Sequence, residues 1–69
     1  MARIIWDRPD NPTLRVSNSL RIERWQLKEA IHRIKASRGL GPTDRIIIYD
    51  DGAVTDRMGD RIGNIYDEI

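Results

Sequence analysis

The strongest pattern along the chain is a helical repeat of apolar residues in its middle third. At about 100° per residue, one stripe collects Leu20, Leu27, Ala30, Ile31 and Ile34. Residues 17–19 offer helix caps before this stripe. After it, Gly39 suits a left-handed position and Pro42 prevents continuation. The pattern therefore predicts one long amphipathic helix over about residues 21–38.

Two short segments before this helix have an extended pattern. Residues 3–6 form an apolar run, which predicts a strand, and Pro9 and Pro12 mark the loop that follows it. Residues 13–16 alternate polar and apolar side chains, which predicts a short extended piece.

The segment after the helix predicts a three-stranded meander. Residues 44–50 are rich in β-branched side chains and read as the central strand, and Asp50-Asp51-Gly52 is a hairpin turn signal. Residues 53–55 and 61–66 supply two more strands. The predicted fold class is α+β with the order β-α-β-β-β. Its helix packs on one face of a small, mainly antiparallel sheet of about four strands.

The length and composition limit what this fold can do alone. The chain has 69 residues and is read as a single domain, residues 1–69. It has no cysteine and one histidine, so we expect neither a thiolate metal site nor any other cofactor. A core of this size supplies no more than ~3–5 kcal/mol, which makes association with a partner or a homo-oligomer attractive. No apolar run approaches the ~20 residues of a membrane span.

The charges nearly balance, so their distribution matters more than their sum. Twelve Lys and Arg against eleven Asp and Glu give a net charge of +1, which predicts no general affinity for nucleic acid. On the predicted helix, however, Arg24, Lys28, His32 and Lys35 follow steps of three and four residues and share one flank, with Trp25 further round the same side.

This basic flank has the side chains that a metal-independent ribonuclease needs. His32 could take or give a proton near neutral pH, and Lys35 could stabilise charge that develops on a phosphate. These two are the candidate catalytic residues. The candidate RNA-binding residues are Arg24, Lys28, Trp25 and Arg45, with Trp25 stacking on an unpaired base.

A structural explanation competes at every one of these positions. A basic flank on a surface helix is usually only solvated, and a lone histidine is more often a surface residue than a catalyst. Trp25 could pack under residues 9–19 or against a partner. The acidic residues near the two turns, Asp50, Asp51, Asp56 and Asp60, are better explained as turn formers than as metal ligands.

A spaced pattern in residues 27–68 resembles a known family. It starts at Leu27 and runs through His32-x-Ile34-Lys35, then Gly52-x-Val54-x-Asp56, then Ile62-Gly63-Asn64-x-x-Asp67-Glu68, with Gly39, Asp44 and Gly59 between these motifs. This pattern resembles the C-terminal domains of bacterial polymorphic toxins, which are carried by Rhs-type and contact-dependent inhibition proteins. Many of these look like the barnase, EndoU, colicin and RelE group, whose members pack a helix on a curved antiparallel sheet and cleave RNA without metal.

The resemblance implies a function with a set of partners. It implies a metal-independent RNA-cleaving toxin module that acts on transfer RNA or another RNA, in which His32 and Lys35 are active-site candidates. A cognate immunity protein would cover the basic flank, and the module would act in bacterial cytoplasm, delivered into a target cell. The alternative is a small non-enzymatic protein-interaction or oligomerisation domain that uses Trp6, Trp25 and Ile22. A nucleic-acid-binding module without catalysis is a third reading.

Overall fold

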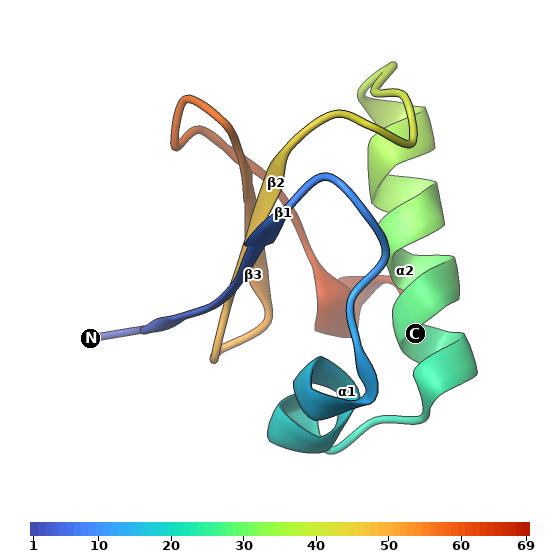
Figure 1. Cartoon of the computed structure of the whole chain (residues 1–69), viewed down its shortest axis with the longest axis vertical. Coiled ribbons are helices and arrows are strands. Elements are labelled where there is room, and N and C mark those ends of the chain that lie inside the picture. Colours follow the sequence, from blue (N-terminus) through green and yellow to red (C-terminus); the bar gives the residue numbers. More distant parts are fainter.

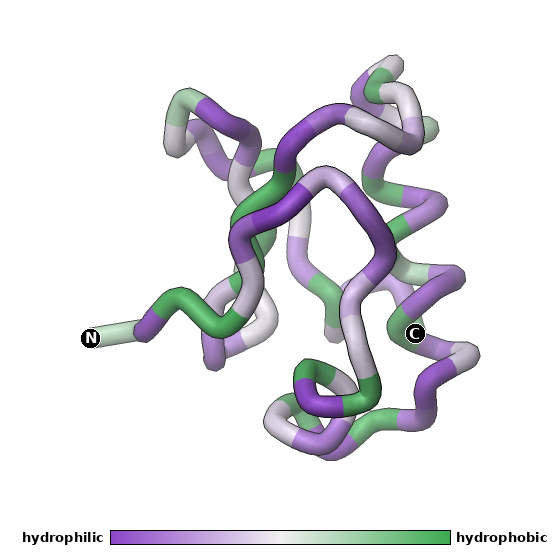
Figure 2. Tube along the Cα trace, viewed as in Figure 1, coloured by the Kyte–Doolittle hydropathy of each residue, from purple (hydrophilic) through white to green (hydrophobic).

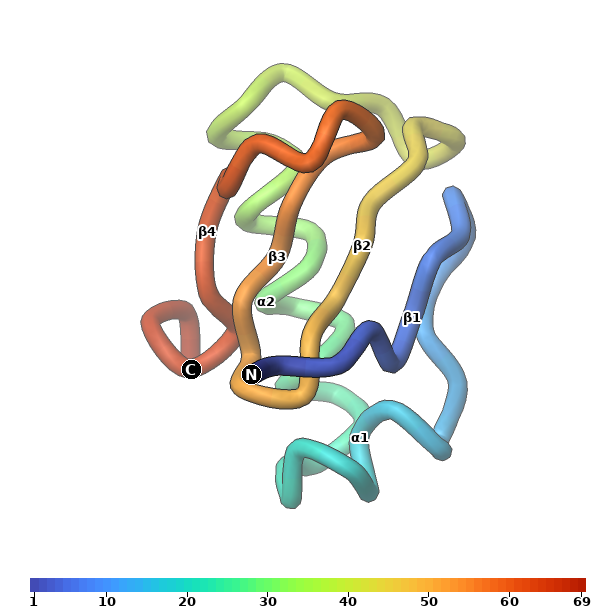
Figure 3. Tube along the Cα trace, turned by 90° about the vertical axis from the view of Figure 1, so that its left-hand side faces the viewer, coloured from blue at the N-terminus to red at the C-terminus, as the bar shows by residue number.

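A four-stranded antiparallel sheet forms one layer of the structure, a computed structural model that describes residues 1–69. Its strands are β1 (Ile4–Arg8), β2 (Ile46–Tyr49), β3 (Ala53–Asp56) and β4 (Arg61–Asn64). They lie side by side in the order β1-β2-β3-β4, as Figure 3 shows. The predicted mainly antiparallel sheet of about four strands, with its C-terminal meander, is therefore confirmed.

Two helices, rather than one, lie between β1 and β2. They are α1 (Leu14–Leu20) and α2 (Arg24–Ser37), and a single 3-10 turn, η1 (Ile65–Asp67), follows β4. The predicted single long helix and the predicted order β-α-β-β-β are wrong, because the chain runs β-α-α-β-β-β. The extended piece predicted at residues 13–16 is also wrong, since most of it lies in α1. Figure 1 shows α2 along one side of the sheet and α1 below it.

The break between the helices has a local cause at Arg21. This residue adopts a left-handed conformation, with φ 56° and ψ 44°, and thereby ends α1. The amide of the next residue, Ile22, donates to the carbonyl oxygen of Ser17 at 3.1 Å, which closes the helix end. A new helix then starts at Glu23, whose amide donates to the Gln26 side chain at 3.0 Å in a capping box.

The core lies between α2 and the central strands. Ile46 and Ile48 of β2 are fully buried, as are Leu27, Ile31 and Ile34 of α2. Figure 2 shows hydrophobic positions gathered in β2 and on the turns of α2 that face it. The predicted apolar stripe is therefore the buried face, although Leu20 joins this core from α1. Neither helix is long and apolar enough to cross a membrane.

The C-terminal turn connects the sheet to α1. The Tyr66 hydroxyl donates to the carbonyl oxygen of Leu20 at 2.8 Å. The ring of Tyr66 lies directly against Gly52, where a Cβ atom would meet the ring carbon Cδ2 at 2.6 Å. At the other side of the core, Gly63 of β4 lets Ile34 approach, since its Cβ would lie 3.1 Å from Ile34 Cγ1.

Candidate functional site

An open groove between α1 and the first turns of α2 collects half of the predicted site residues. Its volume is about 570 Å³, and it is lined by Leu14, Ser17, Asn18, Ile22, Glu23, Arg24, Trp25 and Lys28. Of the six residues singled out from the sequence, Arg24, Trp25 and Lys28 meet here. The kink at Arg21 creates this groove, because it folds α1 back beside the start of α2.

The apolar side chains of the groove are unusually exposed. Trp25 leaves 61% of its surface in solvent and Leu14 leaves 50%, while Ile22 is partly buried against the core. Tryptophan is a large apolar residue with a single N–H donor, so exposing most of it costs favourable burial. The sequence allowed Trp25 to pack under residues 9–19, but its exposure shows that it does not. The groove therefore exposes three apolar side chains, Leu14, Ile22 and Trp25, among polar ones.

Cations form the rim of this groove. Arg24 and Lys28 are exposed, and neither side chain makes a hydrogen bond or ion pair within the fold. The one carboxylate in the lining belongs to Glu23, the capping residue of α2. The groove thus combines aliphatic, aromatic and cationic side chains.

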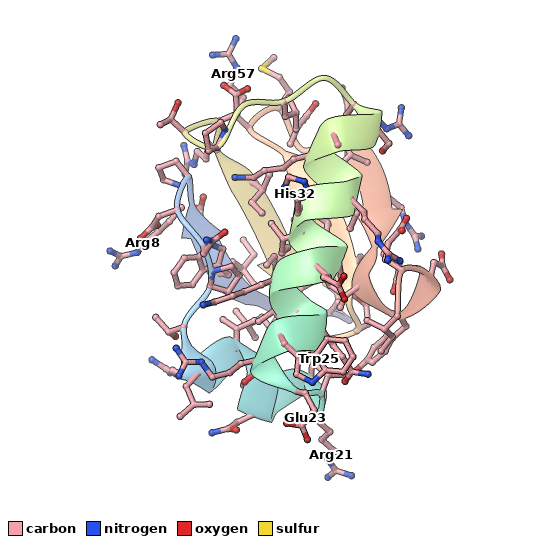
Figure 4. The ribbon with its side chains drawn as sticks, turned by 90° about the vertical axis from the view of Figure 1, so that its right-hand side faces the viewer. Arg8, Arg21, Glu23, Trp25, His32 and Arg57 are labelled. Carbon is pink, nitrogen blue, oxygen red and sulfur yellow. The ribbon has the colours of Figure 1, made fainter.

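His32 lies on the same side of α2 as Trp25 but two turns away. The seven intervening steps return the helix to nearly the same direction and correspond to about 10 Å along its axis. Figure 4 shows His32 in the upper half of α2 and Trp25 near its lower end. The imidazole is exposed, makes no hydrogen bond to another residue, and does not line the groove. Its position leaves it open to solvent and without a positioning partner.

Lys35 does not share this exposed flank. It retains only 6% of its exposed surface, and its ammonium donates to the carbonyl oxygens of Pro9 at 2.8 Å and Pro42 at 3.2 Å. Burial lowers its pKa from the ordinary value of 10.5, although the carboxylates of Asp44 and Asp10 partly oppose this. Lys35 therefore connects two proline-containing loops to α2, and the structure does not bring it together with His32.

Arg45 lies apart from the groove, at the start of β2. Its Nε donates to Asp7 Oδ1 at 2.6 Å, and its Nη2 donates to Asp7 Oδ2 at 2.8 Å. The hydrogen bond from Arg45 lowers the pKa of the Asp7 carboxyl, and the pKa of Arg45 is raised in turn. Arg45 is therefore occupied by a bidentate pair that joins β1 to β2.

The sequence did not identify the α1 wall of the groove. Leu14 was assigned to an extended piece, in which its side chain would have had no relation to Trp25. The available signal was the density of apolar side chains at positions 14, 22 and 25 in a strongly polar region. That signal becomes a site only when the chain turns back at Arg21.

Other candidate chemistry is accounted for by turns. Asp56 Oδ1 accepts the amides of Met58 at 2.8 Å and Asp60 at 3.0 Å, and Asp51 Oδ1 accepts the amide of Ala53 at 3.0 Å. No three His, Asp or Glu side chains lie close enough to hold a metal ion. Comparison with protein-family models, curated proteins and solved structures gives no match to this chain. Function is therefore inferred from the residues and their geometry.

Proposed function

We propose that this chain is a protein-interaction domain that binds an apolar segment of a partner protein in the groove between α1 and α2. The observation that carries this proposal is the exposure of Trp25, 61% of whose surface is in solvent, in a groove that Leu14 and Ile22 also line. Covering these side chains would stabilise a complex at roughly 25 cal/mol for each Å² of apolar surface removed from water.

The residue types of the groove are those that dominate protein interfaces. Tryptophan and arginine are enriched among the few side chains that contribute most of the binding energy, and both occur here at adjacent positions, Trp25 and Arg24. The kink at Arg21 and the capping box hold them on a fixed helix. A preorganised surface of this kind loses little conformational entropy on binding.

A protein partner fits the groove better than RNA does. Two of the three apolar lining residues, Leu14 and Ile22, are aliphatic and offer no stacking surface to a base. The net charge of +1 supplies little long-range attraction to a polyanion.

Peptide selection tests this proposal without a known partner. A displayed library of random peptides is selected against the full chain, and the enriched peptides are synthesised and titrated. We expect Trp25→Ala to weaken their binding at least tenfold, the effect of losing about 1.4 kcal/mol. The control is Met58→Ala, since Met58 is 76% exposed but lies outside the groove.

Two results would contradict the interaction proposal. One is an absence of enriched peptides, and the other is binding that is indifferent to Trp25→Ala. A mass that rises with protein concentration and falls in Trp25→Ala would instead show that a second copy of this chain occupies the groove.

A metal-independent ribonuclease is the second candidate, and the placement of His32 favours it. His32 and Trp25 lie on one side of α2. Lys28 lies three residues after Trp25 and four before His32, which is helical spacing. A strand of RNA could stack a base on Trp25, place a phosphate near Lys28 and meet the imidazole, which would transfer a proton. Lys35 takes no part in this scheme, because its ammonium is already bound to two carbonyl oxygens.

Expression in bacteria separates the ribonuclease from the interaction domain. The toxin reading expects growth arrest and fragmented RNA on induction, both relieved by His32→Ala and by a co-expressed immunity protein. The matched control is Arg33→Ala, because Arg33 is the exposed neighbour of His32 on the helix. Unchanged growth and intact RNA with the wild-type chain would rule out this candidate.

A further inference from the structure

Arg21 is the one residue other than glycine that has a positive φ. Its φ is 56°, and the three other positive φ values of the chain, at positions 39, 52 and 59, all belong to glycines. The left-handed conformation costs an L-residue free energy because Cβ crowds the backbone, and glycine avoids this cost. Position 21 therefore has a backbone conformation that favours glycine, yet it carries an arginine.

Nothing in the fold requires that side chain to be an arginine. The hydrogen bonds that close α1 use only backbone groups: the amides of Arg21 and Ile22 donate to the carbonyl oxygens of Asn18 and Ser17. Arg21 is exposed, and its guanidinium makes no hydrogen bond or ion pair in the structure. Backbone strain of this kind concentrates at functional sites.

The charge of Arg21 adds to a local excess of positive charge. The groove lining holds Arg24 and Lys28 against the single carboxylate of Glu23, and Arg21 adds a third cation next to it, whereas the whole chain has a net charge of only +1. Figure 4 shows the Arg21 side chain extending from the end of the molecule that bears Glu23 and Trp25, away from the body. Arg21 is also the immediate neighbour of Ile22, which lines the groove.

We propose that the groove binds an acidic, apolar segment of a partner protein and that Arg21 is a specificity-determining residue which pairs with carboxylates of that segment. This inference rests on the proposed interaction function and names the chemistry of the partner. Apolar side chains of the segment fill the space beside Leu14 and Trp25. Its carboxylates reach the guanidinium of Arg21 just beyond the groove lining, next to Ile22, where they can form bidentate hydrogen bonds.

Because the backbone at Arg21 is strained, substitutions at this position should change the melting temperature as well as the binding affinity. Arg21→Gly relieves the backbone and removes the charge, so we expect a higher melting temperature together with weaker binding. Arg21→Ala removes the charge and retains the strained backbone, so it weakens binding without the gain in stability. Arg21→Lys retains a positive charge and recovers part of the affinity.

The experiment uses the peptides enriched by selection against the full chain. Each synthetic peptide is titrated as selected and as a counterpart in which every Asp and Glu is replaced by Asn and Gln. We expect the acidic peptide to bind the wild-type chain more tightly than its amide counterpart does. Its affinity for Arg21→Gly and Arg21→Ala should be about fivefold lower than for wild type, and its affinity for wild type should fall as the salt concentration rises. Arg57→Ala is the control for net charge, since Arg57 lies at the opposite end of the molecule in Figure 4.

The outcomes separate this inference from the function on which it rests. If the amide counterparts bind as tightly as the acidic peptides, or if Arg21→Ala and Arg57→Ala weaken binding equally, the role of Arg21 is overturned while groove binding stands. If peptides bind without dependence on Trp25, the groove function itself fails. Binding of single-stranded RNA in preference to every peptide would overturn both and favour the ribonuclease candidate.

Discussion

The hydroxyl of Tyr66 and the carbonyl oxygen of Leu20 are joined by a 2.8 Å hydrogen bond. Leu20 is the last residue of α1, and Tyr66 belongs to the turn that follows the final strand. The bond therefore fixes the end of the short helix that forms one wall of the groove. It also satisfies a carbonyl oxygen at a helix terminus, where no intrahelical partner is available.

Removing this hydroxyl should weaken the fold measurably. We expect Tyr66→Phe to lower the free energy of unfolding by about 1 kcal/mol, the net contribution of a typical hydrogen bond. Urea denaturation measures the change. Tyr49→Phe is the control, since the Tyr49 hydroxyl makes no hydrogen bond within the protein. Equal effects of the two substitutions would show that the bond to Leu20 contributes nothing.

Gly52 should be intolerant of any side chain, and Gly59 offers the comparison. Both have a positive φ, 90° and 85°, but a Cβ at position 52 would lie 2.6 Å from the Tyr66 ring, whereas at position 59 it would meet nothing within 4 Å. We expect Gly59→Ala to cost about 1 kcal/mol from backbone strain and Gly52→Ala about 3 kcal/mol from strain plus overpacking. Thermal unfolding of both variants measures this difference, and similar costs would argue against the close packing.

Lys35 should act on stability rather than on binding. Lys35→Met retains most of the apolar stem but removes the donor to Pro9 and Pro42, so we expect a loss of about 1–2 kcal/mol. Amide hydrogen exchange should rise in both proline-containing loops, while peptide titration of the groove should be unchanged. A variant that loses binding yet keeps wild-type stability would assign Lys35 to function.

Asp7 should make the stability depend on pH in the acid range. Its hydrogen bond with Arg45 lowers the carboxyl pKa below the ordinary 3.8, so the folded state binds fewer protons than the unfolded state in that range. The stabilisation is present above pH 3.8 and disappears as the pH falls through the folded pKa.

Asparagine at position 7 should flatten this acid dependence. Urea midpoints of Asp7→Asn and wild type should differ more at about pH 7 than at a pH below the folded-state pKa, where the carboxyl is protonated in both states. Asp67→Asn serves as the control, because Asp67 is exposed and its side chain accepts no hydrogen bond in the structure. A constant difference at every pH would exclude the Arg45 pair as its source.

The apolar pattern predicted the parts of the fold that depend on burial. Leu27, Ile31 and Ile34 recur at helical spacing because one face of α2 packs on the sheet, and Ile46 and Ile48 alternate because β2 buries one face of a strand. These periodicities are local in the sequence. They therefore predicted the apolar stripe of α2 and the meander, whereas Trp6, which was expected to be exposed, lies in the core.

The features that escaped prediction depend on contacts distant in the sequence or on an atypical residue. The end of α1 carries Arg21 where glycine is usual, and the residues of α1 have the pattern of an extended piece and helix caps, so α1 was not predicted. Lys35 has the spacing of a surface residue, and only the carbonyl oxygens of Pro9 and Pro42, 26 and 7 residues away, make its burial possible. The groove exists only because α1 folds back beside α2, so it could not be predicted without α1 and the break at Arg21.

The insertion of both helices between β1 and β2 has a consequence for the order of folding. Strands β2, β3 and β4 pair through short turns, whereas Arg8 of β1 pairs with Ile46 across more than half of the chain. Closing that long loop costs more entropy than closing a hairpin. The meander and α2 should therefore form the folding nucleus, and β1 should be the last strand to pair. In unfolding, β1 should separate from β2 first, which leaves a three-stranded sheet before the rest of the protein unfolds.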